Sequence, residues 1–116
     1  MRVMSEAETK IAEWIWANPN IKSVDLVRMC ESNYGWKQST VYTLIKRMRE
    51  KEVLINENGR LRMTIDRDGY YHNRAAEFLE TQYQGSLVRF LECCLQDGVD
   101  KRTAGELMHV IRKYTK

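Results

Sequence analysis

The dipeptide Asn58-Gly59 constrains the fold of this chain more than any other feature of its sequence. It lies between the runs VLINE and RLRMTI, both typical of short extended segments. Asn and Gly tolerate the positive φ angles that a two-residue turn needs, so this stretch predicts a β-hairpin with Arg60 at its tip. Arg62 follows two residues later and shares a face with Arg60, because side chains alternate along a strand.

Two short helices are predicted at the start of the chain. Ser5 and Glu8 have the spacing of a capping box, and apolar residues recur at helical spacing up to about residue 17. An Asn-Pro pair then disfavours helical geometry and ends this helix. Ser23 is expected to cap the second helix, and Gly35 is expected to supply the turn that ends it.

A third helix is predicted from Gln38 or Ser39 to about Lys51. Its apolar positions fall on one stripe, formed by Val41, Leu44, Ile45 and Met48. Its opposite face carries Tyr42, Thr43, Lys46 and Glu50, and Glu50 is expected to pair with Lys46 or Arg47. Three short helices and a hairpin follow one another in the order of a winged helix–turn–helix domain, here residues 1–68. The predicted fold class is therefore mainly α, with a small β-hairpin wing.

Residues 69–116 are predicted to form a C-terminal helical dimerisation region. Gly85 should kink or divide its first long helix, and Thr103 with Glu106 has the pattern of a capping box for the last helix. Two such helices have too little core to bury their apolar stripe, so a second copy of the chain is expected to cover it. The residues assigned to this dimerisation are Phe78, Leu79, Leu87, Leu91, Leu95, Leu107 and Ile111.

The positive charge of the chain is concentrated around the third helix and the hairpin. Residues 36–63 contain seven basic and three acidic residues, a net charge of +4, whereas residues 1–35 sum to −1 and residues 64–116 sum to zero. Such a concentration is typical of a phosphate-binding surface and predicts double-stranded DNA as partner. Base contacts are assigned to Ser39, Tyr42, Thr43 and Lys46. Phosphate contacts are assigned to Lys37, Gln38, Thr40, Arg47, Arg49, Arg60 and Arg62.

The segments EAETKIAEWIWANPN, WKQSTVYTLIKRMREKEVL and NGRLRMTI resemble the penicillinase-repressor and copper-repressor family (BlaI, MecI and CopY type). The stretch FLETQYQGSLVRFL looks like the helix of that family's dimerisation domain. The resemblance is carried by Ser5, Glu6, Ala7, Glu8, Trp16, Ala17, Asn18, Pro19, Trp36, Thr40, Val41, Thr43, Leu44, Arg47, Met48, Lys51 and Gly59. It implies a homodimeric, sequence-specific repressor that binds an inverted-repeat operator.

The chain also departs from the pattern of that family. Lys37-Gln38 replaces a serine-proline start of the recognition helix, and Glu52 replaces a glycine after it, which removes a residue suited to the left-handed conformation. The Cys-x-Cys pairs of copper-responsive members are missing, and Cys93-Cys94 stands where β-lactam-responsive members have their asparagine-phenylalanine cleavage site. The inducer or sensor partner is therefore unknown from the sequence.

Other functions find little support in the sequence. There is no Gly-rich phosphate loop, nucleophile elbow or set of spaced metal ligands, so no enzyme, metal or cofactor is expected. Trp14 and Trp36 are expected in the core, and Cys93 and Cys94 as buried small hydrophobic residues. No apolar run approaches a membrane span, and a cytoplasmic protein with reduced thiols is expected. A winged-helix protein-interaction adaptor and a nonspecific DNA-binding protein remain alternatives.

Overall fold

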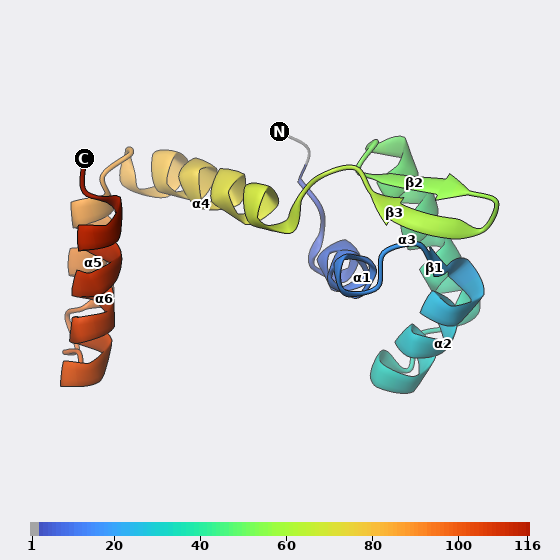
Figure 1. Cartoon of the computed structure of the whole chain (residues 1–116), viewed down its shortest axis with the longest axis horizontal. Helices are drawn as coiled ribbons and strands as arrows, with labels where there is room; N and C mark the ends of the chain where they lie inside the picture. The colour runs from blue at the N-terminus through green and yellow to red at the C-terminus, as the bar shows by residue number, and fades with distance from the viewer. Residues whose placement is uncertain (1–2) are drawn as a thin grey trace. The chain divides into compact units, whose positions relative to one another are not determined.

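The computed structural model describes residues 3–116 as helices with a small antiparallel sheet, which confirms the predicted fold class (Figure 1). The helices are α1 (Glu6–Ala17), α2 (Ser23–Tyr34), α3 (Gln38–Glu50), α4 (Arg67–Tyr83), α5 (Leu87–Cys94) and α6 (Lys101–Tyr114). The strands are β1 (Ile21–Lys22), β2 (Leu54–Glu57) and β3 (Arg60–Met63). The chain divides into two compact units, residues 1–75 and 76–116, and the division falls inside α4.

The start of α1 has the predicted capping box. The backbone N–H of Glu8 donates to Ser5 Oγ at 3.1 Å, and the Ser5 N–H donates to Glu8 Oε1 at 2.8 Å. These reciprocal bonds satisfy two backbone donors at the N-terminus of α1. The Glu8 side chain is only 1 % exposed, whereas Ser5 is exposed, so this cap lies at the edge of the core of the first unit.

The start of α2 differs from the prediction by one residue, because the sheet sets it. Lys22 is the N-cap residue and makes no side-chain capping bond, whereas Ser23 is already the first residue of the helix. Lys22 pairs with Arg60 in the sheet, and the Ser23 N–H donates to the Gly59 carbonyl at 2.8 Å. Gly35 ends α2 as predicted, in the left-handed conformation with φ of 69°.

The predicted hairpin is present and is part of a three-stranded sheet with the order β1-β3-β2. Asn58 and Gly59 both have positive φ angles, 54° and 80°, and Asn56 Oδ1 accepts a bond from the Gly59 N–H at 2.9 Å. The additional strand β1 has only two residues, and its pairing with β3 connects the α1–α2 loop to the hairpin.

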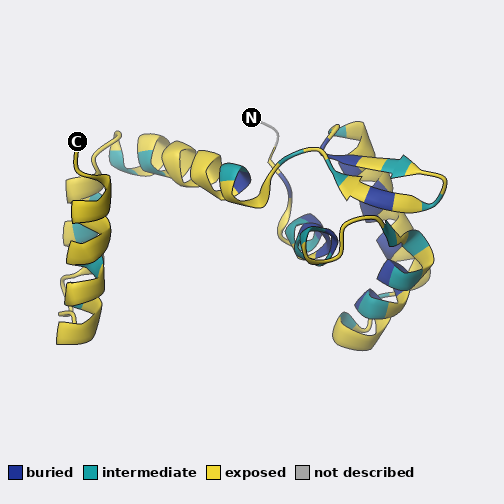
Figure 2. Cartoon of the chain, viewed as in Figure 1, coloured by how far each residue is buried: buried dark blue, intermediate teal, exposed yellow. Residues whose placement is uncertain are grey.

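The core of the first unit is formed where α1, α2, α3 and the sheet meet (Figure 2). The predicted stripe of α3 is buried there, as are Ile11, Ile15, Leu26 and Leu61. Trp14 and Trp36 pack against this core as expected, and both are partly buried. The Trp14 indole N–H donates to the Tyr34 hydroxyl at 3.1 Å, which satisfies its polar atom.

The junction between α3 and β2 keeps a left-handed residue even though no glycine is present. Glu52 has φ of 61°, so the expected loss of this conformation does not occur. The Thr64 hydroxyl donates to the Glu52 carbonyl at 2.7 Å, and the Val53 N–H donates to the Met48 carbonyl at 3.1 Å. These two bonds, one to the Glu52 carbonyl and one from the next residue, stabilise a left-handed conformation that a glutamate rarely adopts.

Helices α5 and α6 have no buried side chain in the single chain, and Figure 2 shows both largely exposed. Gly85 separates α4 from α5, as predicted, with φ of 81°. The N-cap of α6 is Asp100, since the Thr103 N–H donates to Asp100 Oδ1 at 2.7 Å; the capping box predicted at Thr103 was therefore wrong. The Asp100 carboxylate accepts this bond and a second one from the Thr103 hydroxyl. The helix therefore begins at Lys101, before Thr103.

Candidate nucleic-acid interface

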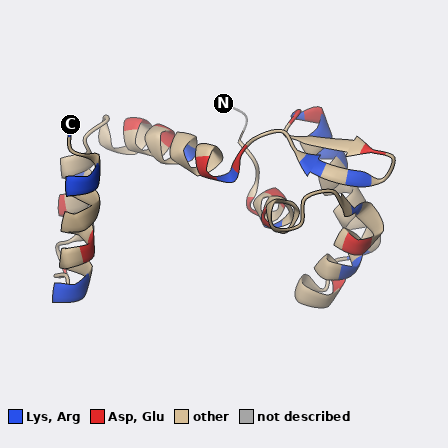
Figure 3. Ribbon diagram, in the orientation of Figure 1, with Lys and Arg blue, Asp and Glu red and all other residues tan. Residues whose placement is uncertain are grey.

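The outward face of α3 is a polar, exposed surface. Every side chain that the sequence assigns to DNA contact is exposed, both along α3 and on the hairpin. Figure 3 shows the Lys and Arg positions on α3 and β3. Because the apolar stripe of α3 is buried against the core, the opposite face with Tyr42, Thr43 and Lys46 has to point outward.

The N-terminus of α3 is open to an anion. Its N-cap is Lys37, and among the described residues no side chain bonds to the first backbone N–H groups of the helix. The first turn contains no acidic residue. The Thr40 N–H donates to the Lys37 carbonyl at 3.0 Å, and a helix start of this kind, with its positive dipole end and no acidic side chain, favours an anion.

The hydroxyl of Thr43 is already engaged within α3. It donates to the Ser39 carbonyl at 2.9 Å, one turn back along the helix. What Thr43 offers outward is therefore its methyl group and the lone pairs of its oxygen. Such a group packs on a thymine methyl or accepts a bond from the exocyclic amine of adenine or cytosine.

A groove of about 450 Å³ separates the C-terminal half of α3 from strand β2. It is lined by Lys46, Arg49, Glu50, Leu54, Ile55 and Asn56. Glu50 makes no ion pair with Lys46 or Arg47 in the part of the chain that the structure describes, so that expected pairing was wrong. The Glu50 carboxylate is exposed in the same groove as Lys46 and Arg49. Among residues 3–116 neither of these two cations forms an ion pair with it.

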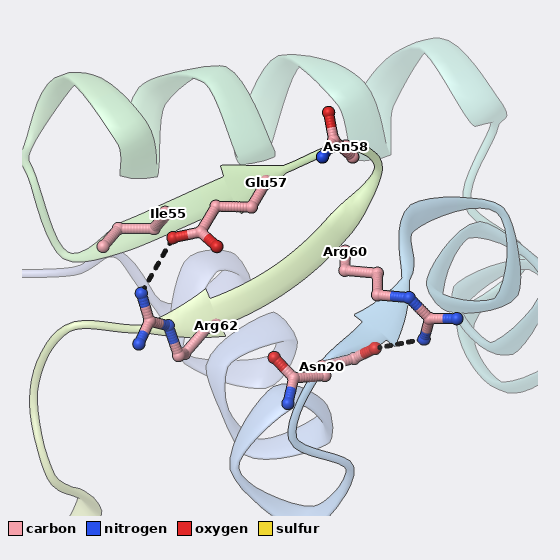
Figure 4. Close-up of a pocket in the computed structure, with 6 residues that line it drawn as sticks. All are labelled: Asn20, Ile55, Glu57, Asn58, Arg60 and Arg62. Atoms are coloured by element: carbon pink, nitrogen blue, oxygen red, sulfur yellow. Dashed lines mark hydrogen bonds and ion pairs between the residues drawn. The ribbon is translucent and has the colours of Figure 1, made fainter.

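The two arginines of the hairpin line a hollow of about 290 Å³ together with Asn20, Ile55, Glu57 and Asn58 (Figure 4). Arg60 Nη1 donates to the Asn20 carbonyl at 3.2 Å, and Arg62 Nη2 donates to Glu57 Oε1 at 3.0 Å. Arg60 therefore keeps its full charge at the tip, whereas the charge of Arg62 is partly balanced. The pairing of Arg62 with Glu57 was not predicted from the sequence, although the strand register places Glu57 opposite Arg60 and diagonal to Arg62.

Lys51, one of the seven basic residues of segment 36–63, is engaged away from the exposed face of α3. Its ammonium donates to Glu8 Oε1 at 2.5 Å and to the Val3 carbonyl at 3.1 Å. Burial of the Glu8 carboxyl raises its pKa, but the hydrogen bonds from Lys51 and the Ser5 amide outweigh burial and leave the pKa below its ordinary value. This ion pair joins the edge of the core of the first unit, where Glu8 is buried, to the partly exposed Lys51.

A second network joins α1 to the first turns of α4. Arg67 Nε donates to Glu13 Oε2 at 2.9 Å, and the Tyr71 hydroxyl donates to Glu13 Oε1 at 2.6 Å. These two bonds hold the pKa of Glu13 below its usual range. The hydrogen bond from the Tyr71 hydroxyl to Glu13 raises the pKa of Tyr71, because the carboxylate holds the phenol proton.

The cysteines do not form a metal site in this chain. Cys30 is buried, and burial raises the pKa of its thiol. Cys93 and Cys94 are exposed, so their expected burial was wrong for the single chain; residues 76–116 on their own bury no side chain fully. Over residues 3–116, no group of three His, Cys, Asp or Glu residues is arranged to hold a metal ion.

None of the described helices has both the length and the apolar character that crossing a membrane requires. The family model described as penicillinase repressor matches residues 4–113, which includes nearly all of both units. A search of curated proteins found no match.

Proposed function

Because the chain belongs to the penicillinase repressor family, which implies a DNA-binding transcriptional repressor, we propose that it recognises an inverted-repeat operator as a homodimer. One observation supports this proposal: six of the seven basic residues of segment 36–63 are exposed, and all six lie on α3, at its N-cap or on the hairpin. A helix lying in the major groove beside a wing on the neighbouring phosphates needs such a surface.

The roles on this surface follow from the chemistry of its side chains. Ser39, Tyr42, Thr43 and Lys46 face outward from the middle and start of α3, where base edges are within reach of a docked helix. Lys46 donates to the guanine acceptors O6 and N7, and Thr43 contributes its methyl group and oxygen lone pairs. The residues that hold phosphate are Lys37, Gln38, Thr40, Arg47, Arg49, Arg60 and Arg62.

A second copy of the chain is the proposed partner of residues 76–116. Phe78, Leu87, Leu95 and Ile111 are exposed in the single chain, and Leu79, Leu91 and Leu107 are only partly covered. Exposed apolar residues this extensive on α4, α5 and α6 need a partner, and a closed two-fold dimer covers the same patch on both chains. Two α3 helices held by one dimer then enter major grooves about one helical turn, or a multiple of it, apart.

The proposal is tested by selecting bound duplexes from a genomic or random pool with the purified full-length protein. At about 0.15 M salt, exposed charges more than about 8 Å apart are already screened, so nonspecific attraction is reduced. The expected result is an enriched inverted repeat with two equivalent half-sites. Enrichment of no sequence, by protein that is shown to be folded, would overturn the proposal and leave nonspecific binding or protein docking as the use of the basic surface.

A further inference from the structure

Lys51 connects the C-terminal end of α3 to the start of α1. It directly follows Glu50, the last residue of α3, and its ammonium reaches the Glu8 carboxylate and the Val3 carbonyl. Glu8 is separated from Lys51 by more than 40 residues of sequence and is 1 % exposed. The helix that carries the proposed base contacts is therefore tied at one end to a buried carboxylate through a lysine that is itself only partly buried.

The ion pair between Lys51 and Glu8 is not needed merely to fill space in the protein. Burying the Glu8 carboxylate is costly even though the Lys51 side chain stays 36 % exposed, and apolar residues of the same size are often at least as stabilising. Glu8 Oε2 is buried and has no hydrogen-bond partner among residues 3–116, which adds to that cost. A directional ion pair offers what apolar contact does not, namely a fixed distance between two particular atoms.

The other contacts of α3 restrict its position less strongly. Its buried face consists of aliphatic side chains and one methionine, whose packing is not directional, and its N-terminus has no side-chain cap. At the C-terminal end, Lys51 is followed directly by Glu52 and Val53, whose backbone groups bond to Thr64 and Met48. The hydrogen bonds that connect this end of α3 to α1 and to the hairpin are thus gathered at one junction.

We propose that Lys51 is a positioning residue for operator recognition: through Glu8 it holds α3 at the height and rotation at which its outward face meets the base edges. The proposal rests on the proposed function, and it gives Lys51 no contact with phosphate. Base contacts depend on geometry within a hydrogen-bond length, whereas phosphate attraction does not. Loss of the ion pair should therefore reduce discrimination between sequences more than it reduces general affinity.

The test compares Lys51→Met with Arg49→Met, which removes a neighbouring cation from the exposed face of α3. Affinities for the selected operator and for a scrambled duplex are measured over a range of salt concentrations, with the fold checked by circular dichroism. For Lys51→Met we expect the ratio of the two affinities to fall about tenfold, on the scale of one good base contact, with the salt slope unchanged. For Arg49→Met we expect an unchanged ratio and a salt slope lower by about 0.9.

The double variant Glu8→Gln/Lys51→Met separates positioning from simple loss of stability. Glutamine can still cap α1, and no buried charge is left without a partner, so the melting temperature should recover relative to Lys51→Met. The affinity ratio should nevertheless stay low, because no ion pair holds α3. A double variant whose affinity ratio returns to the wild-type value would overturn the inference. A lower salt slope in the single variant Lys51→Met would overturn it as well. A wild-type protein that does not discriminate would instead refute the proposed function.

Discussion

Replacing Glu57 by glutamine should strengthen DNA binding, because it removes a negative charge beside the two arginines of the hairpin. Glu57 accepts a bond from Arg62 at 3.0 Å, and both side chains are more than half exposed. In the proposed complex the hairpin lies against phosphates, so the Glu57 carboxylate opposes them and competes with them for Arg62. Glutamine keeps the size of the side chain and an acceptor oxygen while it removes the charge.

The size of the effect can be bounded from simple electrostatics. A carboxylate about 7 Å from a phosphate in water is repelled by about 0.6 kcal/mol, a factor of about three in affinity. If Arg62 is released to neutralise one more phosphate, the salt slope steepens by about 0.9, which amounts to about fivefold at about 0.15 M salt relative to about 1 M. The exposed Arg62–Glu57 pair contributes only about 0–1 kcal/mol to folding, so stability should change little.

The assay is fluorescence anisotropy with operator and scrambled duplexes at several salt concentrations. Glu57→Gln should raise affinity for both duplexes by about three- to fivefold, because phosphate contacts carry no sequence information. Glu106→Gln is the matched control, since Glu106 also pairs with an exposed arginine, Arg102 at 3.3 Å, but lies in α6. Equal affinities for wild type and Glu57→Gln, with equal salt slopes, would show that the hairpin does not approach the phosphates.

Three further predictions concern base readout, assembly and pH. Lys46→Ala should lower affinity for the operator about tenfold and leave affinity for a scrambled duplex nearly unchanged in the same anisotropy assay; equal losses on both would refute its contact with bases. A chain ending at residue 75 should sediment as a monomer and bind the operator much more weakly, because the second half-site is no longer held in the same complex; a dimer of this fragment would contradict the role given to residues 76–116. Glu8 and Glu13 have folded-state pKa values below 4.5, so their contribution to stability is complete above about pH 4.5 and is lost as pH falls through the folded values. Thermal melting between about pH 7 and about pH 3 should show this loss, and Glu13→Gln should reduce it.

The sequence predicts the elements whose signals are local. The Asn58-Gly59 turn, the Ser5–Glu8 cap and the Gly35 end of α2 each depend on residues a few positions apart, and the structure has all three. The buried stripe of α3 is equally local, since helical periodicity alone identifies it. These features were sufficient to derive the winged arrangement.

Features that depend on distant partners could not be derived in the same way. Strand β1 has two residues and exists through its pairing with β3, about 40 residues away. Glu52 keeps a left-handed conformation with the help of a bond from Thr64, and Lys51 leaves the basic surface because Glu8 lies next to it in space. Each of these results depends on tertiary contacts that overrule the preference of a single residue.

Whether α3 reads base sequence can be measured in one equilibrium competition. Labelled operator recovered from the pool is displaced by unlabelled operator or by a scrambled duplex of equal length and composition, at about 0.15 M salt. If α3 contacts the bases, the operator should compete at least about 10³-fold better, the lower end of the range for specific DNA-binding proteins. Equal competition by the two duplexes would contradict base readout by α3, because the basic surface would then hold DNA through phosphates alone.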